Sequence, residues 1–468
     1  MDPGQGGGFQ PHLRRQTRAT GLGFAPVIQL PAQSTQIGEG RFSSGRTAVR
    51  GFHVPQLYRN SFETSRILAE ATRLNISDHG AIGDGKTLNT VAIQAVIDQC
   101  AGEGGGTLVV PKGEFVSGAL FLKPGVNVEL REGAVLKGST NIGDYPKANT
   151  RIEGHFEPWP AALLNGDKVD HLRLTGPGTL DGSGATFWQE FYRQRKNNHK
   201  TTNLNVERPR LVFIQNSEDV QVSGVNFNNS GFWNLHLYRC RQVTVENCRF
   251  ESPHGGSGRA PSTDGMDVDS SQDVTISKSF FSVGDDCIAL KGSKGPFAMQ
   301  DKDSRPVERI HIRDCIFKAG GGIVTFGSEA TVVRDVDVER CTSLGVAVLR
   351  LKLRADTPQL YENIRLHDLT LEHAGVLFSI APWDQYFDLK GQPPPKSVVR
   401  NITIADVKGS CESLGRITGN PATEIEGIVL KDAEVEPIDP NFEVGQVKGL
   451  KFDHVVVNGR PMPAPTDL

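Results

Sequence analysis

The sequence predicts an all-β protein built as a parallel β-helix, a solenoid, with a short helix capping its N-terminal end. The first observation is composition. The chain of 468 residues is 37% hydrophobic and 22% charged and holds 52 glycines and 27 prolines, as expected of a soluble protein with many turns. The second is a strand-like phrase that recurs at intervals of 23 to 38 residues. The third is the scarcity of helical periodicity, which argues against a helical bundle.

The recurring phrase places two apolar residues around a polar one, followed by a polar pair and another apolar residue. It begins at Val220, Val243, Val274, Ile310, Val336, Ile364 and Ile402, and a related phrase begins at His171. One such unit cannot bury its own apolar face, so successive units stack as rungs and share a continuous core. A blade-type propeller is the structural alternative, but its blades need about 40 residues and four strands each.

The elements follow in chain order. Residues 1–72 are rich in Gly, Gln, Arg and Ser and are predicted to form a partly extended leader, with a short helix possible over residues 60–72. A clearer helix is predicted over residues 89–100, where Asn89 or Thr90 can cap it and apolar residues fall on one stripe. This helix can cover the open end of the core. Residues 73–455 are predicted to form one solenoid domain, followed by a C-terminal tail at 456–468.

Charge and cysteine content narrow the class of protein. A formal net charge of -3 argues against a nucleic-acid-binding protein, which usually carries a basic excess. The seven cysteines form no CxxC pair, so neither a zinc site nor a disulfide scaffold is predicted. There is no apolar run of about 18 residues to span a membrane, and the first 20 residues lack the apolar stretch of a signal peptide. We therefore expect a monomer without nucleic-acid or membrane partners.

The segment from residue 262 to 295 concentrates carboxylates among strand-like runs. Asp264 and Asp285 are 21 residues apart, close to one rung, so stacking would bring Asp264 beside Asp285 and Asp286. Carboxylates held together repel one another, which raises the affinity of at least one for a proton. One protonated acid and one ionised acid are what glycoside hydrolysis requires. A solvated acidic face and a calcium site are the alternatives.

Four motifs occur in an order that resembles glycoside hydrolase family 28, the polygalacturonases and rhamnogalacturonases. They are STDGMDVDSS from Ser262, GDDCIALKG from Gly284, GGIVTFGSE from Gly321 and RLK from Arg350. The resemblance extends from about residue 75 to about residue 440. It implies a right-handed parallel β-helix and an inverting hydrolase. In that enzyme Asp285 would be the general acid, and Asp264 and Asp286 would activate the attacking water.

The same resemblance implies a binding site for an acidic sugar. Arg350 and Lys352 match the basic motif that would hold the sugar carboxylate, the first as a planar fork and the second as a point charge. Tyr386 lies about where polygalacturonases carry a tyrosine that contacts substrate. Without the resemblance, Arg350 and Lys352 would be taken as two exposed basic residues alternating on a strand.

The sequence departs from the family pattern in two places. Ser262 stands where asparagine is usual, and Gly321 or Gly322 occupies the position of a histidine that supports the catalytic acid in polygalacturonases. Members that cleave rhamnogalacturonan also lack this histidine. The missing side chain is expected to enlarge the cleft, which would suit a substrate other than a smooth galacturonan chain.

Eight aromatic residues are candidates for sugar-stacking surfaces, although many are expected to pack in the core or in loops. They are Trp159, Phe187, Trp188, Tyr192, Phe232, Trp233, Trp383 and Tyr386. The segment that begins at Phe187 mixes aromatic and basic residues, as either a cleft wall or an ordinary surface helix would.

Together these features predict an inverting hydrolase of pectin-type, galacturonate-containing poly- or oligosaccharides, with rhamnogalacturonan as an alternative to plain polygalacturonan. No metal or other cofactor is required, because both the acid and the base are carboxylates. An enzyme for large polymers is expected to be secreted or periplasmic. Two alternatives stay open: a polysaccharide lyase that uses calcium, and a non-catalytic carbohydrate-binding solenoid.

Overall fold

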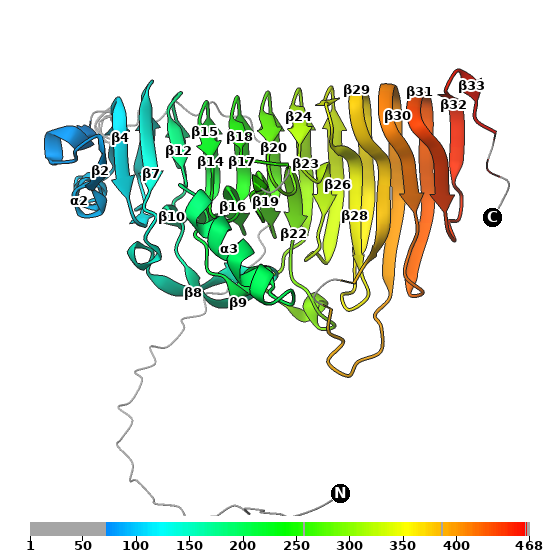
Figure 1. Cartoon of the computed structure of the whole chain (residues 1–468), viewed down its shortest axis with the longest axis horizontal. Coiled ribbons are helices and arrows are strands. Elements are labelled where there is room, and N and C mark those ends of the chain that lie inside the picture. Colours follow the sequence, from blue (N-terminus) through cyan, green and yellow to red (C-terminus); the bar gives the residue numbers. More distant parts are fainter. Residues whose placement is uncertain (1–71, 256–257, 385–386, 464, 466–468) are drawn as a thin grey trace, which may run out of the picture. The chain divides into compact units, whose positions relative to one another are not determined.

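The chain folds as a right-handed parallel β-helix, as the sequence predicts (Figure 1). The computed structural model describes residues 72–255, 258–384, 387–463 and 465. Residues 1–71 of the predicted leader, including nearly all of the helix considered over residues 60–72, lie outside the described residues, and so does Tyr386. Each rung contributes strands to three parallel ladders, so the propeller alternative is wrong.

The strands of the three ladders are as follows. The first ladder holds β5 (Leu120–Phe121), β10 (Leu164–Asp167), β13 (Val212–Gln215), β16 (Leu235–Tyr238), β19 (Met266–Asp269), β22 (Ile288–Lys291), β25 (Gly322–Phe326) and β28 (Ala347–Arg354). The second holds β1 (Arg73–Asn75), β3 (Gly106–Val110), β6 (Val126–Leu130), β11 (Arg173–Thr175), β14 (Glu218–Ser223), β17 (Arg241–Glu246), β20 (Gln272–Ser277), β23 (Val307–Arg313) and β26 (Val332–Glu339). The third holds β2 (Asp84–Leu88), β4 (Gly113–Ser117), β7 (Ala134–Gly138), β12 (Thr179–Asp181), β15 (Asn226–Asn228), β18 (Arg249–Glu251), β21 (Phe280–Ser282), β24 (Ile316–Ala319) and β27 (Thr342–Ser343).

Near the C-terminal end of the stack the strands become long enough to pass through several ladders. These strands are β29 (Leu360–Trp383), β30 (Ser397–Ile417) and β31 (Thr423–Val444), followed by β32 (Lys451–Val457) and β33 (Arg460–Pro461). Strand β29 pairs with β26, β27 and β28 in turn. The paired strands therefore extend from Arg73 to Pro461, and the division into leader, solenoid domain and tail stays a prediction.

The register of the second ladder confirms the repeat seen in the sequence. Val220, Val243, Val274, Ile310, Val336, Ile364 and Ile402, which begin the seven phrases, are consecutive partners along the ladder. All seven are buried, so the first apolar residue of each phrase forms one continuous stripe of the core. The alternation of the phrase thus fixes the register, because a slip by one residue would expose this stripe.

The last residue of four phrases builds a second core stripe in the third ladder. Phe227, Phe250, Phe281 and Phe317 stack with ring centroids 4.6, 4.8 and 5.0 Å apart and nearly parallel planes. Between the two stripes the chain turns a corner, with one residue per rung at positive φ. Asn247 and Asp314 occupy this corner, and Asn and Asp tolerate the left-handed region better than most residues.

Helix α2 (Thr90–Gly102) lies at the N-terminal end of the stack, as predicted (Figure 1). The predicted stripe of Ile93, Val96, Ile97 and Cys100 is its buried face. The Asn89 side chain does not cap the helix, however. It donates to the carbonyls of Thr87 and Ile82 at 2.7 and 3.1 Å instead, and so holds the preceding loop against the stack.

The remaining elements lie outside the ladders. Helix α3 (Ala185–Asn197) follows β12, and strands β8 (Lys147–Ile152) and β9 (His155–Pro160) form a two-stranded antiparallel hairpin. Short 3-10 helices are η2 (Ile76–His79), η3 (Ile142–Asp144), η4 (Asn203–Asn205) and η6 (Ala298–Gln300). Neither α-helix of the described residues has the length and apolar content needed to cross a bilayer.

Candidate active site

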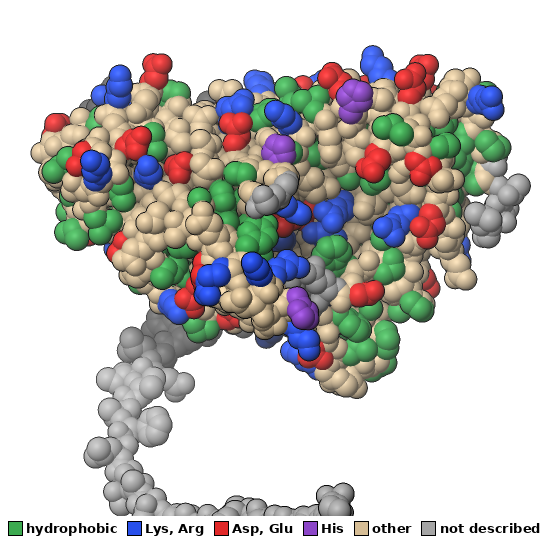
Figure 2. Space-filling model, in the orientation of Figure 1, with side chains coloured by type: hydrophobic (Ala, Val, Ile, Leu, Met, Phe, Trp, Pro, Cys, Tyr) green, Lys and Arg blue, Asp and Glu red, His purple; other side chains and the backbone are tan. Residues whose placement is uncertain are grey.

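A cleft of about 320 Å³ lies over the first ladder. Strands β22 and β28 and the turns before β19, before β22 and after β25 supply its floor, and α3 and the turn of the β8–β9 hairpin supply its walls. In the space-filling view, basic side chains gather in the hollow at the centre of the face shown and along α3 at its edge (Figure 2). The register of the first ladder brings the predicted acids into this cleft.

All three predicted aspartates line this cleft. Met266 of β19 pairs with Ile288 of β22, and Asp264 and Asp286 each lie two residues before this pair. Asp264 therefore stacks on Asp286, 22 residues later, rather than on Asp285 as a spacing of 21 residues suggested. Asp264 and Asp286 are buried, whereas Asp285 is only half-buried and lies beside them at the cleft wall.

Asp286 is held by cations and a hydroxyl. Lys352 Nζ lies 2.5 Å and Arg350 Nη1 3.1 Å from its two oxygens, and Thr325 Oγ1 donates to it at 3.0 Å. Burial by itself would raise the pKa of Asp286, but Lys352 and then Arg350 outweigh it and hold that pKa well below its usual range. Asp286 is therefore ionised, and the two predicted substrate-binding residues contact it directly.

The pKa of Asp264 is shifted in the opposite direction from that of Asp286. Burial, reinforced by repulsion from Asp285 and Asp286, raises its pKa to about 7, against the opposing effect of Lys291. The sequence predicted that crowding would raise the proton affinity of at least one acid, and the effect falls on Asp264. The cleft thus pairs a fixed carboxylate with one that titrates near neutrality.

Sequence reasoning missed several charged residues of the cleft. Lys291, at the end of β22, lies within 4 Å of Asp264, Asp267 and Glu329. Glu153 comes from the turn of the β8–β9 hairpin, more than 100 residues earlier in the chain. A signal existed for Lys291 and Glu329, because each lies in a motif already singled out, GDDCIALKG and GGIVTFGSE.

A buried ion pair fixes the hairpin that carries Glu153. Arg151 Nε donates to Asp269 Oδ2 at 2.9 Å, and both side chains are almost completely buried. The guanidinium also lies over the ring of Tyr238, 5.2 Å from its centroid. Asp269 belongs to β19, which begins two residues after Asp264, so this contact holds the hairpin against that strand.

The expectation that a missing histidine enlarges the cleft is wrong at Gly321. A Cβ atom placed on Gly321 would overlap Asp286 Oδ1 and Arg350 Nη1. The backbone of Gly321 is not at positive φ, so only this crowding requires a glycine there. The Arg350 guanidinium fills the space that a side chain at this position would need.

Three of the eight candidate aromatic residues, Tyr192, Trp233 and Trp383, line the cleft. Trp159, Phe187, Trp188 and Phe232 are buried away from it, and Tyr386 lies outside the described residues. Lys352 Nζ lies 4.9 Å from the centroid of the Trp383 ring, so this aromatic residue covers the basic pair. The segment that begins at Phe187 lies mostly in helix α3, Ala185–Asn197. Because Tyr192 of this helix lines the cleft, the helix is a cleft wall.

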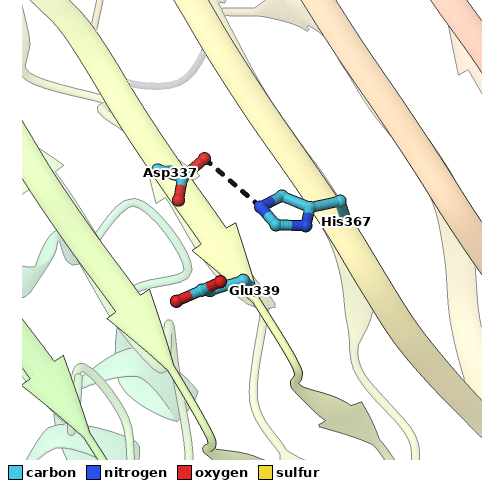
Figure 3. A group of neighbouring side chains, drawn as sticks. All are labelled: Asp337, Glu339 and His367. Carbon is cyan, nitrogen blue, oxygen red and sulfur yellow. Dashed lines mark ion pairs between the residues drawn. The ribbon is translucent and has the colours of Figure 1, made fainter.

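Among the described residues, one group of side chains has the spacing of a metal site, and it lies outside the cleft on β26 and β29 (Figure 3). In this group the Nε2 atom of His367 lies 3.5 Å from Asp337, and Nδ1 lies 2.7 Å from Asp368. Glu339 pairs with Arg340 at 2.5 Å. These ion pairs account for the group without a metal. In the cleft, the ammonium and guanidinium groups of Lys291, Lys352 and Arg350 occupy the space between the carboxylates.

The chain is similar to known proteins in sequence and in fold. Residues 100–453 match the model of the family described as glycosyl hydrolases family 28. An exopolygalacturonase of Zea mays is 29% identical over 375 residues, which cover 77% of this chain and 83% of that protein. The crystal structure of a hyperthermoactive exopolygalacturonase from Thermotoga maritima aligns with a TM-score of 0.72 at 24% identity, over 88% of this chain and 98% of that one. A polygalacturonase from Erwinia carotovora aligns over 83% and 96% with a TM-score of 0.61 at 21% identity.

Proposed function

Because this chain belongs to glycosyl hydrolases family 28, we propose that it hydrolyses galacturonan pectin with inversion at the anomeric carbon. The observation that carries the proposal is the cleft itself, in which Asp264, Asp285 and Asp286 meet beside Arg350 and Lys352. Carboxylates supply the acid and the base that the reaction needs, and the cations supply recognition of an anionic sugar.

The three aspartates take different roles because their surroundings differ. Asp285 is the half-buried acid at the cleft wall and gives its proton to the leaving glycosidic oxygen. Asp286 is ionised and orients the attacking water by accepting a hydrogen bond from it. Asp264 has the higher proton affinity of the stacked pair, with a pKa of about 7, and receives the proton that the water loses.

Recognition of the substrate follows from the same cations. Arg350 remains partly exposed while it contacts Asp286, so its free N–H groups can bind the carboxylate of a galacturonate residue. Arg195 and Arg259 line the cleft as well and extend its positive charge. Trp383 offers an aromatic surface beside the basic pair.

Plain galacturonan is the preferred substrate in this proposal. The reason to favour rhamnogalacturonan was open space in place of a histidine, and Arg350 fills that space at Gly321. A guanidinium at this point adds charge for a uronate. Rhamnogalacturonan is the second candidate, supported by the absence of the histidine. Because the substrate is a large polymer, we expect the enzyme to work in a secreted or periplasmic compartment.

Product analysis tests the proposal. The protein is incubated with polygalacturonate, rhamnogalacturonan and their oligosaccharides, and the first product is observed by proton NMR before mutarotation. We expect new reducing ends with inverted anomeric configuration on galacturonan. Retained configuration would contradict the mechanism. Unsaturated products that absorb ultraviolet light and vanish with a chelator would indicate the calcium lyase, and binding without new reducing ends would indicate a carbohydrate-binding solenoid.

A further inference from the structure

Lys291 is a buried cation with no place in the mechanism described so far. It ends β22, and its side chain is 6% exposed. Its ammonium nitrogen lies 3.5 Å from Asp264 Oδ2, 3.4 Å from Asp267 Oδ1 and 3.7 Å from Glu329 Oε2. The Trp233 ring covers it, with the centroid 4.6 Å away. One positive charge is thus shared by three carboxyl groups beneath the cleft.

Asp267 is the most deeply buried of these three carboxyl groups. Its side chain is completely buried in β19, and within 4 Å Lys291 is the one cation near its carboxyl among the described residues. Burial first, and the nearby Asp264 second, raise the pKa of Asp267 well above its usual range. The raised pKa disfavours the ionised form of Asp267, so the charge of Lys291 is shared mainly between Asp264 and Glu329, whose pKa it lowers.

Other charged groups face Asp264 from the elements packed around it. Asp285 and Asp286 lie at the start of the β22 rung, Lys352 approaches from β28, and Arg208 approaches from the chain before β13. Lys352 is in contact with Asp286, at 2.5 Å. Lys291 is thus the one cation within 4 Å of the Asp264 carboxyl among the described residues.

We infer that Lys291 is a positioning residue for hydrolysis, because its ammonium lets the buried Asp264 carry the negative charge with which it accepts a proton from water. The inference rests on the proposed function and names a further residue for it. Without Lys291, Asp264 would keep its proton at neutral pH and could not act as the base.

Replacing Lys291 by methionine removes the charge and keeps most of the side chain, and Lys291→Arg keeps the charge. The protonation midpoint of Asp264 is followed by 13C NMR of protein labelled at the aspartate carboxyl carbons, with its resonance identified by its absence in Asp264→Asn. The wild-type midpoint is expected near pH 7. In K291M it should rise by about one to three pH units, and in K291R it should stay close to the wild type.

The pH profile of kcat/KM on polygalacturonate provides the second readout. Because the base must be ionised, activity should fall as pH drops through the Asp264 midpoint. K291M should therefore lose about 5- to 500-fold at pH 7 and recover at higher pH. A purely structural role would lower activity at every pH without recovery. If K291M does not fold, the double variant K291M/D267N, which buries one acid fewer, should show the same alkaline shift.

The outcomes separate the two proposals. A wild-type midpoint in K291M, or an equal shift in K291R, overturns the role of Lys291. A shifted midpoint in K291M, with a wild type that hydrolyses no pectin substrate, supports the charge role of Lys291 and overturns the proposed hydrolysis. A shift in both the NMR titration and the pH profile supports both.

Discussion

Two groups of charged residues on this β-helix lie in different surroundings. In the cleft, Asp286 and Lys352 are 1% and 9% exposed, and they form an ion pair beneath α3 and the β8–β9 hairpin. On the second ladder, Asp337 and Glu339 are 33% and 25% exposed and form ion pairs with His367 and Arg340, respectively. Both groups pair acidic and basic side chains of different rungs. Only the first is shielded from water.

Shielding changes what each ion pair contributes. Water screens the outer pairs, so each is worth about 0 to 1 kcal/mol. In the cleft, Asp286 has lost its hydration and depends on Arg350 and Lys352, so removal of either cation leaves its buried charge less well compensated. Exposure therefore yields a surface ladder in one place, and burial yields carboxyl groups of strongly different pKa in the other.

The largest effect is expected from Asp285→Asn, which removes the proposed proton donor from the cleft and keeps its shape. Turnover on oligogalacturonides should fall by about 10²- to 10⁴-fold while substrate affinity, measured calorimetrically, stays similar. Substrates with good leaving groups should be partly spared, because they need less protonation. An Asp285→Asn variant with near-normal turnover would remove the acid role from Asp285.

Lys352→Ala and Arg350→Ala test the buried cations. Each should weaken the binding of galacturonate substrates on the order of 1.5 to 3 kcal/mol, because a charge-assisted contact is lost. Lys352→Ala should also lower the free energy of unfolding by about 3 to 5 kcal/mol, since it strands the buried Asp286. Kinetics on charged and neutral oligosaccharides, with urea unfolding, measure both. If a neutral sugar proves the best substrate and neither variant affects it, the uronate assignment fails.

Gly321→Ala tests whether the Arg350 guanidinium needs the space above this glycine. The new Cβ would push the guanidinium away from Asp286, so kcat/KM on polygalacturonate should fall about tenfold. Gly102→Ala is the matched control, because a Cβ at that position of α2 meets nothing within 4 Å. Equal activity of the two variants would show that the crowding at Gly321 has no consequence.

The smallest effect is expected from the exposed ion pair of Asp337 on the second ladder. Asp337→Asn should change the free energy of unfolding by no more than about 1 kcal/mol and leave kcat/KM unaltered, because its ion pair is exposed to water. Dialysis against a chelator should likewise change neither stability nor activity. A fall in melting temperature after chelation that Asp337→Asn abolishes would identify the group in Figure 3 as a metal site.

The rungs were predictable because their signal is local and repeated. Each phrase from Val220 to Ile402 carries its own alternation, and the structure pairs the first residues of all seven. The stacking partner of Asp264 was harder to predict. A spacing of 21 residues pointed to Asp285, but the turns before β22 place Asp286 in register. Loop lengths within a rung decide such one-residue differences, and periodicity does not report them.

Sequence by itself determined the β-helix, the capping helix and the meeting of Asp264, Asp285 and Asp286 on one face, because strand alternation and rung stacking follow from short-range patterns. Only the tertiary structure decided the chemistry of that face. Lys291 lies among three carboxyl groups because β19 and β22 pair in one register, and Arg350 fills the space over Gly321 because β25 pairs with β28. Burial beneath α3 and the hairpin, which join segments far apart in the chain, then removes the water that would otherwise make these charges equivalent.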